Sequence, residues 1–402
     1  MGLLAKMRLS GWVGIAVLVF GMPAGRAQAP AAKPAASAPK PSQTAPATPA
    51  PKAAQAVPAT PPPPPPIPSP QPPFPNIPAA QLSWATVVDA AAPAPLLPET
   101  DADRLRHAAI SGGRAIVLFE SSPQSNHGGR PLAVYRLASL ELTTGKILVQ
   151  RDLPGPSRPA LFATDDDHMI LQQATLSRLN PDLSESGEQF GDPLHTAGWR
   201  DFLLSPDGST MAFFLNSSTR FLDTHTLQAF AGRIENPEPA AISKKWLLST
   251  APVWNHQFPQ DTSFIALYGG RSPYLLYHGP CAGHPVFLDE QRILTVACAK
   301  VTIYELSGKV MKELPLGAAY GAFAGLSRDG SRFAIESSDY SVTDPAFSAT
   351  ELFTIYDAQS YAPVATVTPD SLPDARSWAA FSQDGKSFLT GSARKVSLYK
   401  IP

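Results

Sequence analysis

Two cysteines and two neighbouring histidines are the residues whose types and spacing most readily suggest chemistry. Cys281 and Cys298 are the only cysteines in the 402 residues, and His278 and His284 flank the first of them. A two-residue turn at Asp289-Glu290 would place the cysteines directly opposite each other across one hairpin, so we predict a disulfide. Closing that loop would contribute about 3 kcal/mol by the chain-entropy estimate. The alternative is a tetrahedral zinc site on both histidines and the thiolates, which the irregular spacing disfavours.

The densest group of titratable residues is Asp165-Asp166-Asp167-His168. Such groups can bind calcium or take part in acid–base chemistry, but at the tip of a hairpin they more often form a solvated turn. The sequence contains no G-x-S-x-G nucleophile elbow, no H-E-x-x-H zinc motif and no glycine-rich phosphate loop. We therefore predict no catalytic, cofactor-binding or metal-binding residue and no cofactor.

One short turn motif recurs three times and indicates the elements that must carry these residues. Each copy reads Ser-x-Asp-Gly after an apolar run, and a large apolar residue follows the glycine by three positions. Asp-Gly supplies the positive φ of a tight hairpin, so each copy predicts two antiparallel strands. The residues with this structural role are Ser205, Asp207, Gly208, Ser327, Asp329, Gly330, Ser382, Asp384 and Gly385.

Related but degenerate turns continue the pattern along the chain at intervals of about 45 residues, which is the period of a β-propeller blade. Seven such turns can be counted, and a second hairpin signal within several units predicts four strands per unit. The last unit offers only three strands, and the apolar run at residues 82–88 has no partner of its own. We expect an all-β fold, a single propeller with seven four-stranded blades, in which that run supplies the fourth strand of the last blade. Five tryptophans are expected to pack between blades: Trp84, Trp199, Trp246, Trp254 and Trp378.

The Ser-x-Asp-Gly turn with its apolar strand resembles the TolB-type, WD-repeat-like propeller repeat of exported bacterial proteins. The Leu222-Asp223 and Tyr356-Asp357 pairs stand where WD-repeat proteins place their name dipeptide. The resemblance extends over the whole predicted propeller and implies interaction scaffolding as the commonest use. It assigns no functional residue, because the matched positions form turns.

Residues 1–80 differ in composition from the rest of the chain. Lys6 and Arg8 precede an apolar run at residues 11–22 and a small-residue region, which is typical of a secretory signal cleaved after Ala27. The alternative is an uncleaved signal-anchor. Twenty of the 45 prolines lie in residues 30–80, so this segment is predicted to be an extended linker without helix or sheet. The expected organisation is a signal peptide at 1–27, a Pro/Ala-rich disordered linker at 28–80 and a propeller at 81–402.

Charge and compartment limit the function classes. Residues 1–80 carry six basic residues and no acid, leaving 26 bases against 33 acids in the propeller. An acidic propeller argues against nucleic acid as a partner. An exported, periplasmic or secreted location favours the disulfide, and we expect no membrane span after signal cleavage.

We expect a monomeric binding module for a protein or a small ligand on a propeller face, near the two long loops at residues 121–130 and 337–350. The alternative is a propeller enzyme of the hydrolase or lactonase type with its site in the central channel. Three or more converging Asp, Glu, His or Asn side chains there would favour the enzyme, and an apolar channel would favour the module.

Overall fold

The computed structural model divides into two units, Met1–Pro64 and Pro65–Pro402, and the described residues belong to the second. It describes residues 76–88, 103–121, 134–153, 159–191, 200–215, 218–235, 239–250, 263–269, 274–279, 283–318, 320–338, 351–369, 378–392 and 395–402. These ranges contain the strands of the propeller and most of its short turns.

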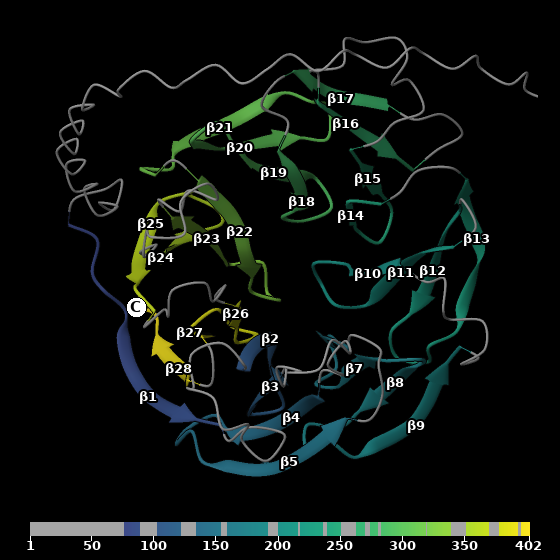
Figure 1. Cartoon of the computed structure of the whole chain (residues 1–402). Coiled ribbons are helices and arrows are strands. Elements are labelled where there is room, and N and C mark those ends of the chain that lie inside the picture. The colour runs from purple at the N-terminus through teal and green to yellow at the C-terminus, as the bar shows by residue number, and fades with distance from the viewer. Residues whose placement is uncertain are drawn as a thin grey trace, which may run out of the picture. The chain divides into compact units, whose positions relative to one another are not determined.

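The described residues form seven antiparallel sheets of four strands each, arranged as the blades of a propeller (Figure 1). Six blades are built from consecutive strands, and the seventh has the order β1-β28-β27-β26. The N-terminal strand therefore closes the ring, which confirms the predicted all-β seven-bladed propeller and its closure. Closure of this kind pairs strands that would otherwise remain as exposed edges.

Blades 1 to 3 consist of the following strands: β2 (Asp103–Ser111), β3 (Arg114–Ser121), β4 (Val134–Glu141), β5 (Ile147–Leu153), β6 (Ala160–Ala163), β7 (Met169–Gln172), β8 (Leu176–Leu179), β9 (Glu185–Phe190), β10 (Arg200–Leu204), β11 (Thr210–Leu215), β12 (Ser218–Asp223) and β13 (Ala229–Glu235). Blades 4 to 6 consist of β14 (Ala241–Ile242), β15 (Leu247–Ser249), β16 (Ser263–Tyr268), β17 (Tyr274–Gly279), β18 (His284–Phe287), β19 (Arg292–Ala297), β20 (Lys300–Glu305), β21 (Val310–Pro315), β22 (Tyr320–Leu326), β23 (Arg332–Ser338), β24 (Glu351–Asp357) and β25 (Pro363–Val367). Blade 7 combines β26 (Trp378–Phe381), β27 (Ser387–Ser392) and β28 (Lys395–Lys400) with β1 (Gln81–Val87).

The closing strand β1 contacts three blades. It pairs with β28 from Gln81↔Lys400 to Val87↔Lys395. The indole nitrogen of Trp84 donates to the carbonyl oxygen of Leu142 in blade 1 at 2.8 Å. On the other side, Ala79 forms a parallel bridge with Thr366 of β25. The N-terminal strand thus joins blades 6, 7 and 1, and pairing begins just before the expected start of the propeller at residue 81.

The hydrophobic core lies between the blades. Among the described residues, buried apolar side chains gather in seven clusters, and each cluster combines residues of two adjacent blades. Between blades 6 and 7, for example, Phe353 and Phe388 pack edge to face with ring centroids 5.3 Å apart. Because strands in a blade are covered on both faces by neighbouring blades, their apolar runs are nearly continuous rather than alternating.

Candidate functional site

Four turns between the first and second strands of a blade share one hydrogen bond. In the three expected copies the serine hydroxyl donates to the aspartate two residues later: Ser205 to Asp207 at 2.7 Å, Ser327 to Asp329 at 2.7 Å and Ser382 to Asp384 at 2.8 Å. In blade 2, Thr164 donates to Asp166 Oδ1 at 2.7 Å in the same way. The acidic run at residues 165–167, expected as one of the degenerate turns of the repeat, is therefore a fourth copy of the motif.

The backbone of the fourth copy matches the other three. Gly208, Gly330 and Gly385 have φ values of 79°, 69° and 67°, and Asp167 stands at the equivalent position with φ 62°. Aspartate is one of the few side chains that tolerate this left-handed region. The turn at 164–167 thus keeps the geometry of the motif but carries carboxylates at its variable position and at its glycine position.

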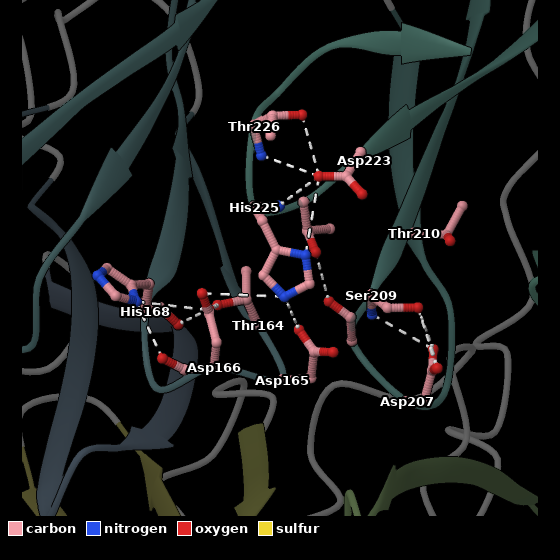
Figure 2. A network of polar contacts seen from close by, with 12 residues as sticks. Thr164, Asp165, Asp166, His168, Asp207, Ser209, Thr210, Asp223, His225 and Thr226 are labelled. Carbon is pink, nitrogen blue, oxygen red and sulfur yellow. Dashed lines mark hydrogen bonds and ion pairs between the residues drawn. The ribbon is translucent and has the colours of Figure 1, made fainter.

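These carboxylates belong to a network across the seam between blades 2 and 3, which we call the acidic corner: Asp165, Asp166, Arg178 and His225. Figure 2 shows Asp165, Asp166 and His225 of this network. Arg178 extends from β8, forms an ion pair with Asp166 and donates through Nη1 to the carbonyl oxygen of His225 at 2.9 Å. His225 lies in the turn between β12 and β13, and its Nε2 is 2.9 Å from Asp165 Oδ1.

The electrostatics of the acidic corner favour charged carboxylates. Partial burial raises the pKa of Asp166, but hydrogen bonds from Thr164 and Arg178 together with the Arg178 charge lower it to about 2. Because the Arg178 side chain is only 8% exposed, its charge acts through a medium of lower dielectric than water. The pair Asp166–Arg178 is therefore ionised at neutral pH.

The acidic corner also holds the one group of possible metal ligands found among the described residues. One oxygen each of Asp165 and Asp166 and one nitrogen of His225 lie within 4.8 Å of one another. Two carboxylates and an imidazole suit a divalent cation. However, the Arg178 guanidinium already neutralises Asp166, so a cation would have to compete with a charge that the fold itself supplies.

Turns of adjacent blades contact one another at the end of the propeller that carries the turns between the first and second strands of each blade. The contacts that link consecutive blades are Gly112 N to Asp167 Oδ1 at 3.1 Å, Lys244 Nζ to Asp207 Oδ2 at 2.6 Å, Lys244 N to Glu290 Oε1 at 2.9 Å and Asp329 N to Gln383 O at 3.1 Å. Partial burial raises the pKa of Asp207, and hydrogen bonds from Lys244, Ser205 and Ser209 bring it below its ordinary value. These contacts join the turns of blades 1 and 2, 3 and 4, 4 and 5, and 6 and 7.

A pocket of about 180 Å³ lies at the innermost strands of five blades. Small and apolar residues dominate its described wall, and Arg328 is the one charged side chain there. The lining residues are Ala108, Ala109, Ile110, Ala163, Leu204, Pro206, Gly208, Gly325, Leu326, Arg328, Ala379, Ala380 and Phe381. The described part of the channel wall at this pocket thus contains no Asp, Glu, His or Asn.

Arg328 occupies the variable position of the motif turn in blade 6. Its Nη2 donates to the carbonyl oxygen of Ile110 in blade 1 at 3.2 Å, whereas its buried Nη1 has no hydrogen-bond partner among the described residues. Desolvation lowers the pKa of Arg328, and the more distant charges of Asp167, Asp165 and Asp166 oppose that shift. In the part of the chain that the structure describes, no carboxylate forms an ion pair with this guanidinium. Its charge therefore faces the pocket without a counter-ion from these residues.

The expected disulfide geometry differs from the structure in one respect. The turn between β18 and β19 spans residues 288–291, closed by a bond from Leu288 N to Arg292 O at 2.9 Å, rather than the two residues Asp289-Glu290. Consequently His284 pairs with Val296, one residue away from the register that would set Cys281 directly opposite Cys298. Asp289 causes the wider turn because its side chain accepts hydrogen bonds from the backbone of Gln291 and Arg292.

Several expectations fall outside the described residues. Cys281 lies there, so the Cys281–Cys298 disulfide and the alternative zinc site with His278 and His284 both stay predictions. The long loops at 121–130 and 337–350 lie almost entirely there, as do Trp199 and Trp254. Trp84 is buried and packs between blades 7 and 1, as expected of the tryptophans.

Sequence reasoning missed the two features that combine distant residues. Asp165 and His225 meet across a seam from turns in two different blades, and nothing in their local patterns pairs them. Arg328 was visible as the variable residue of a Ser-x-Asp-Gly turn. The available signal was the comparison of that position among copies, where Pro206 and Gln383 are uncharged.

Comparison with known proteins finds similarity only among solved structures. No protein-family model matches the sequence, and no curated protein has a detectably similar sequence. Among solved structures, the C-terminal WD40 domain of Sif2 is 9% identical over 81% of this chain and 99% of that chain, with a TM-score of 0.43. A chain of the mitotic checkpoint complex is 9% identical over 86% and 98%, with a TM-score of 0.49, and BamB from Moraxella catarrhalis is 12% identical over 73% and 81%, with a TM-score of 0.36. Within the described part of the chain, no helix is long and apolar enough to cross a membrane.

Proposed function

We propose that this protein is an exported binding module of the TolB-like kind, whose propeller is carried on a Pro/Ala-rich tether. The secretory features of residues 1–27 and the proline content of residues 30–80 support export and a spacer. N-terminal sequencing of the protein from its native cells should find a chain that begins at Gln28. A chain that retains residues 1–27 would contradict the proposed cleavage.

The observation that carries the binding function is the wall of the channel pocket. Alanines, glycines and larger apolar residues form a preshaped cavity with one polar anchor, which is the usual composition of a ligand site. Acid–base chemistry would require titratable side chains within hydrogen-bond reach of a substrate in this pocket, and its described wall offers only a guanidinium that stays protonated. The site is suited to hold a ligand rather than to transform one.

Capture of a protein partner tests the module on its other expected surface. The full chain, and a variant with both loops at residues 121–130 and 337–350 replaced by Gly/Ser sequences of equal length, would be cross-linked in native extracts. We expect the wild type to capture a defined partner and the loop variant to lose it while the unfolding temperature stays within a few degrees. Equal capture by both proteins would contradict a loop-based interface.

A metal-dependent enzyme is the second candidate, because the ligand atoms of Asp165, Asp166 and His225 lie close together. The full chain and its D165N variant would be purified without chelator, and their zinc, calcium and manganese contents would be measured. A binding module predicts far less than one metal ion per chain in both proteins. One ion per wild-type chain that is lost in D165N would support the enzyme and contradict the proposed function.

A further inference from the structure

We propose that the channel pocket binds a small apolar monocarboxylate, whose carboxylate group pairs with the Arg328 guanidinium. This inference deepens the proposed binding function and rests on it. It assigns the ligand class of a pocket whose wall comes from blades 1, 2, 3, 6 and 7.

The anionic part of the ligand follows from Arg328. Arg328 is partly buried and its Nη1 is shielded from water, and among the described residues no ion pair and no bond to Nη1 offsets the cost of that desolvation. The bond from Nη2 to the Ile110 carbonyl oxygen fixes the side chain at the pocket wall. A guanidinium fixed in this way is preorganised for an anion, since less side-chain entropy is lost on binding.

A single negative charge fits this environment better than two. The planar fork of arginine matches the two oxygens of a carboxylate. The described wall of the pocket offers no lysine, serine, threonine or second arginine, so a phosphate would leave most of its oxygens without donors. The carboxylates of Asp165, Asp166 and Asp167 are close enough to act on the Arg328 charge, and they would repel a dianion more strongly than a monoanion.

The rest of the ligand follows from the pocket wall. Ile110, Leu204, Leu326 and Phe381 offer apolar surface, while alanines and Gly325 leave the space open. An engineered cavity of about 150 Å³ is large enough to bind benzene, and this pocket has about 180 Å³. A branched aliphatic or single-ring body therefore fits this volume.

Isothermal titration calorimetry on the full chain tests the assignment with three probes: isobutyrate, benzoate and inorganic phosphate. The variants R328M and R328K both remove the guanidinium. R328M also removes the positive charge, whereas R328K retains it. G325A narrows the pocket, because a Cβ at Gly325 would lie 3.7 Å from Phe381 Cδ2, an ordinary contact without backbone strain. K386Q is the matched control, since it removes one positive charge from an exposed turn of blade 7.

We expect K386Q to bind isobutyrate with the same affinity as wild type, and likewise benzoate. Both proteins should bind phosphate much more weakly than either carboxylate. R328M should lose at least about tenfold in carboxylate affinity, as expected for the loss of a charge-assisted hydrogen-bond pair, and R328K should lie between it and wild type. G325A should weaken benzoate more than isobutyrate without lowering the unfolding temperature.

Three results would overturn the inference: no carboxylate binding by wild type, unchanged affinity in R328M, or phosphate binding as tight as that of benzoate. If one of these results is found and the protein partner is still captured in a loop-dependent way, the carboxylate assignment fails but the proposed binding module stands. Stoichiometric metal at Asp165 would instead overturn the proposed function itself, so the two failures are distinguishable.

Discussion

The acidic corner and the Arg328 pocket lie at the same end of the propeller, but they differ in whether their arginine forms an ion pair. In the acidic corner, Arg178 is paired with Asp166, so the fold itself supplies that carboxylate with a counter-ion. In the pocket, Arg328 forms no ion pair with any described residue, although the charges of Asp165, Asp166 and Asp167 act on it from a greater distance. Both sites are built on the same turn motif, which means that the motif does not dictate the difference.

This difference distinguishes a network that stabilises the fold from an arginine that is available to bind a ligand. A paired network holds neighbouring blades together and can be explained by stability alone. A buried charge without a partner costs stability, and such features persist mainly where a function requires them. We therefore expect the acidic corner to matter for folding and Arg328 to matter for binding.

Gly208 is the point where the two regions meet, and its substitution should have the largest effect. It lines the pocket with φ 79°, and a Cβ there would lie 2.9 Å from the backbone nitrogen of Asp165. Because backbone must move in the acidic corner, G208A should lower the free energy of unfolding by about 3 kcal/mol. Urea denaturation followed by fluorescence would measure it.

The control for that prediction is Gly330, at the same motif position with φ 69° and no atom within 4 Å of the added Cβ. G330A carries only the cost of the left-handed backbone, about 1 kcal/mol. Equal losses in G208A and G330A would show that the acidic corner and the pocket are not packed as described.

Arg178 tests the structural role of the acidic corner. R178M leaves Asp166 without its counter-ion and removes the bond to the His225 carbonyl oxygen across the seam. Since the Asp166 side chain is one-third exposed, we expect a loss of about 2 kcal/mol, less than for a fully buried pair. K300M, which breaks the exposed pair Lys300–Glu313, should lower the free energy of unfolding far less than R178M does, because both side chains are solvated. Similar losses in the two variants would contradict the role assigned to the acidic corner.

The pH dependence of stability gives a smaller effect from the same pair. The pKa of Asp166 is about 2 in the folded protein against an ordinary value of 3.8. A lowered pKa means that the ionised carboxylate stabilises the fold above pH about 4, and that this contribution is lost as the pH falls from about 4 towards 2. The stability difference between wild type and D166N should shrink across this window, as measured by urea unfolding at successive pH values. A difference that is constant down to pH about 2 would count against the ion pair.

The fold could be predicted because its information is local. Each Ser-x-Asp-Gly turn specifies a hairpin through a hydroxyl–carboxylate bond and one residue of positive φ, and the turns repeat at the spacing of a blade. The strand at 81–87 could be assigned to the last blade because that unit lacked a strand.

The candidate site could not be predicted because its residues come together only when the ring closes. Arg328 and Ile110 are 218 residues apart, and their contact depends on how the closed ring places blade 6 relative to blade 1. The hairpin at residues 284–297 shows a second limit. Asp289 widened the turn by side-chain bonds to the backbone, which shifted the register by one residue from that of a two-residue turn.

The stability of R328M without ligand tests most directly whether the pocket is built for binding rather than for folding. Replacing this partly buried guanidinium, which forms no ion pair with the described residues, by an apolar side chain of similar length removes a partly desolvated charge and one hydrogen bond to Ile110. We predict that the free energy of unfolding in urea stays within about 0.5 kcal/mol of wild type or rises above it. A loss of about 2 kcal/mol, like that expected for R178M, would show that Arg328 is a structural residue and would contradict the account.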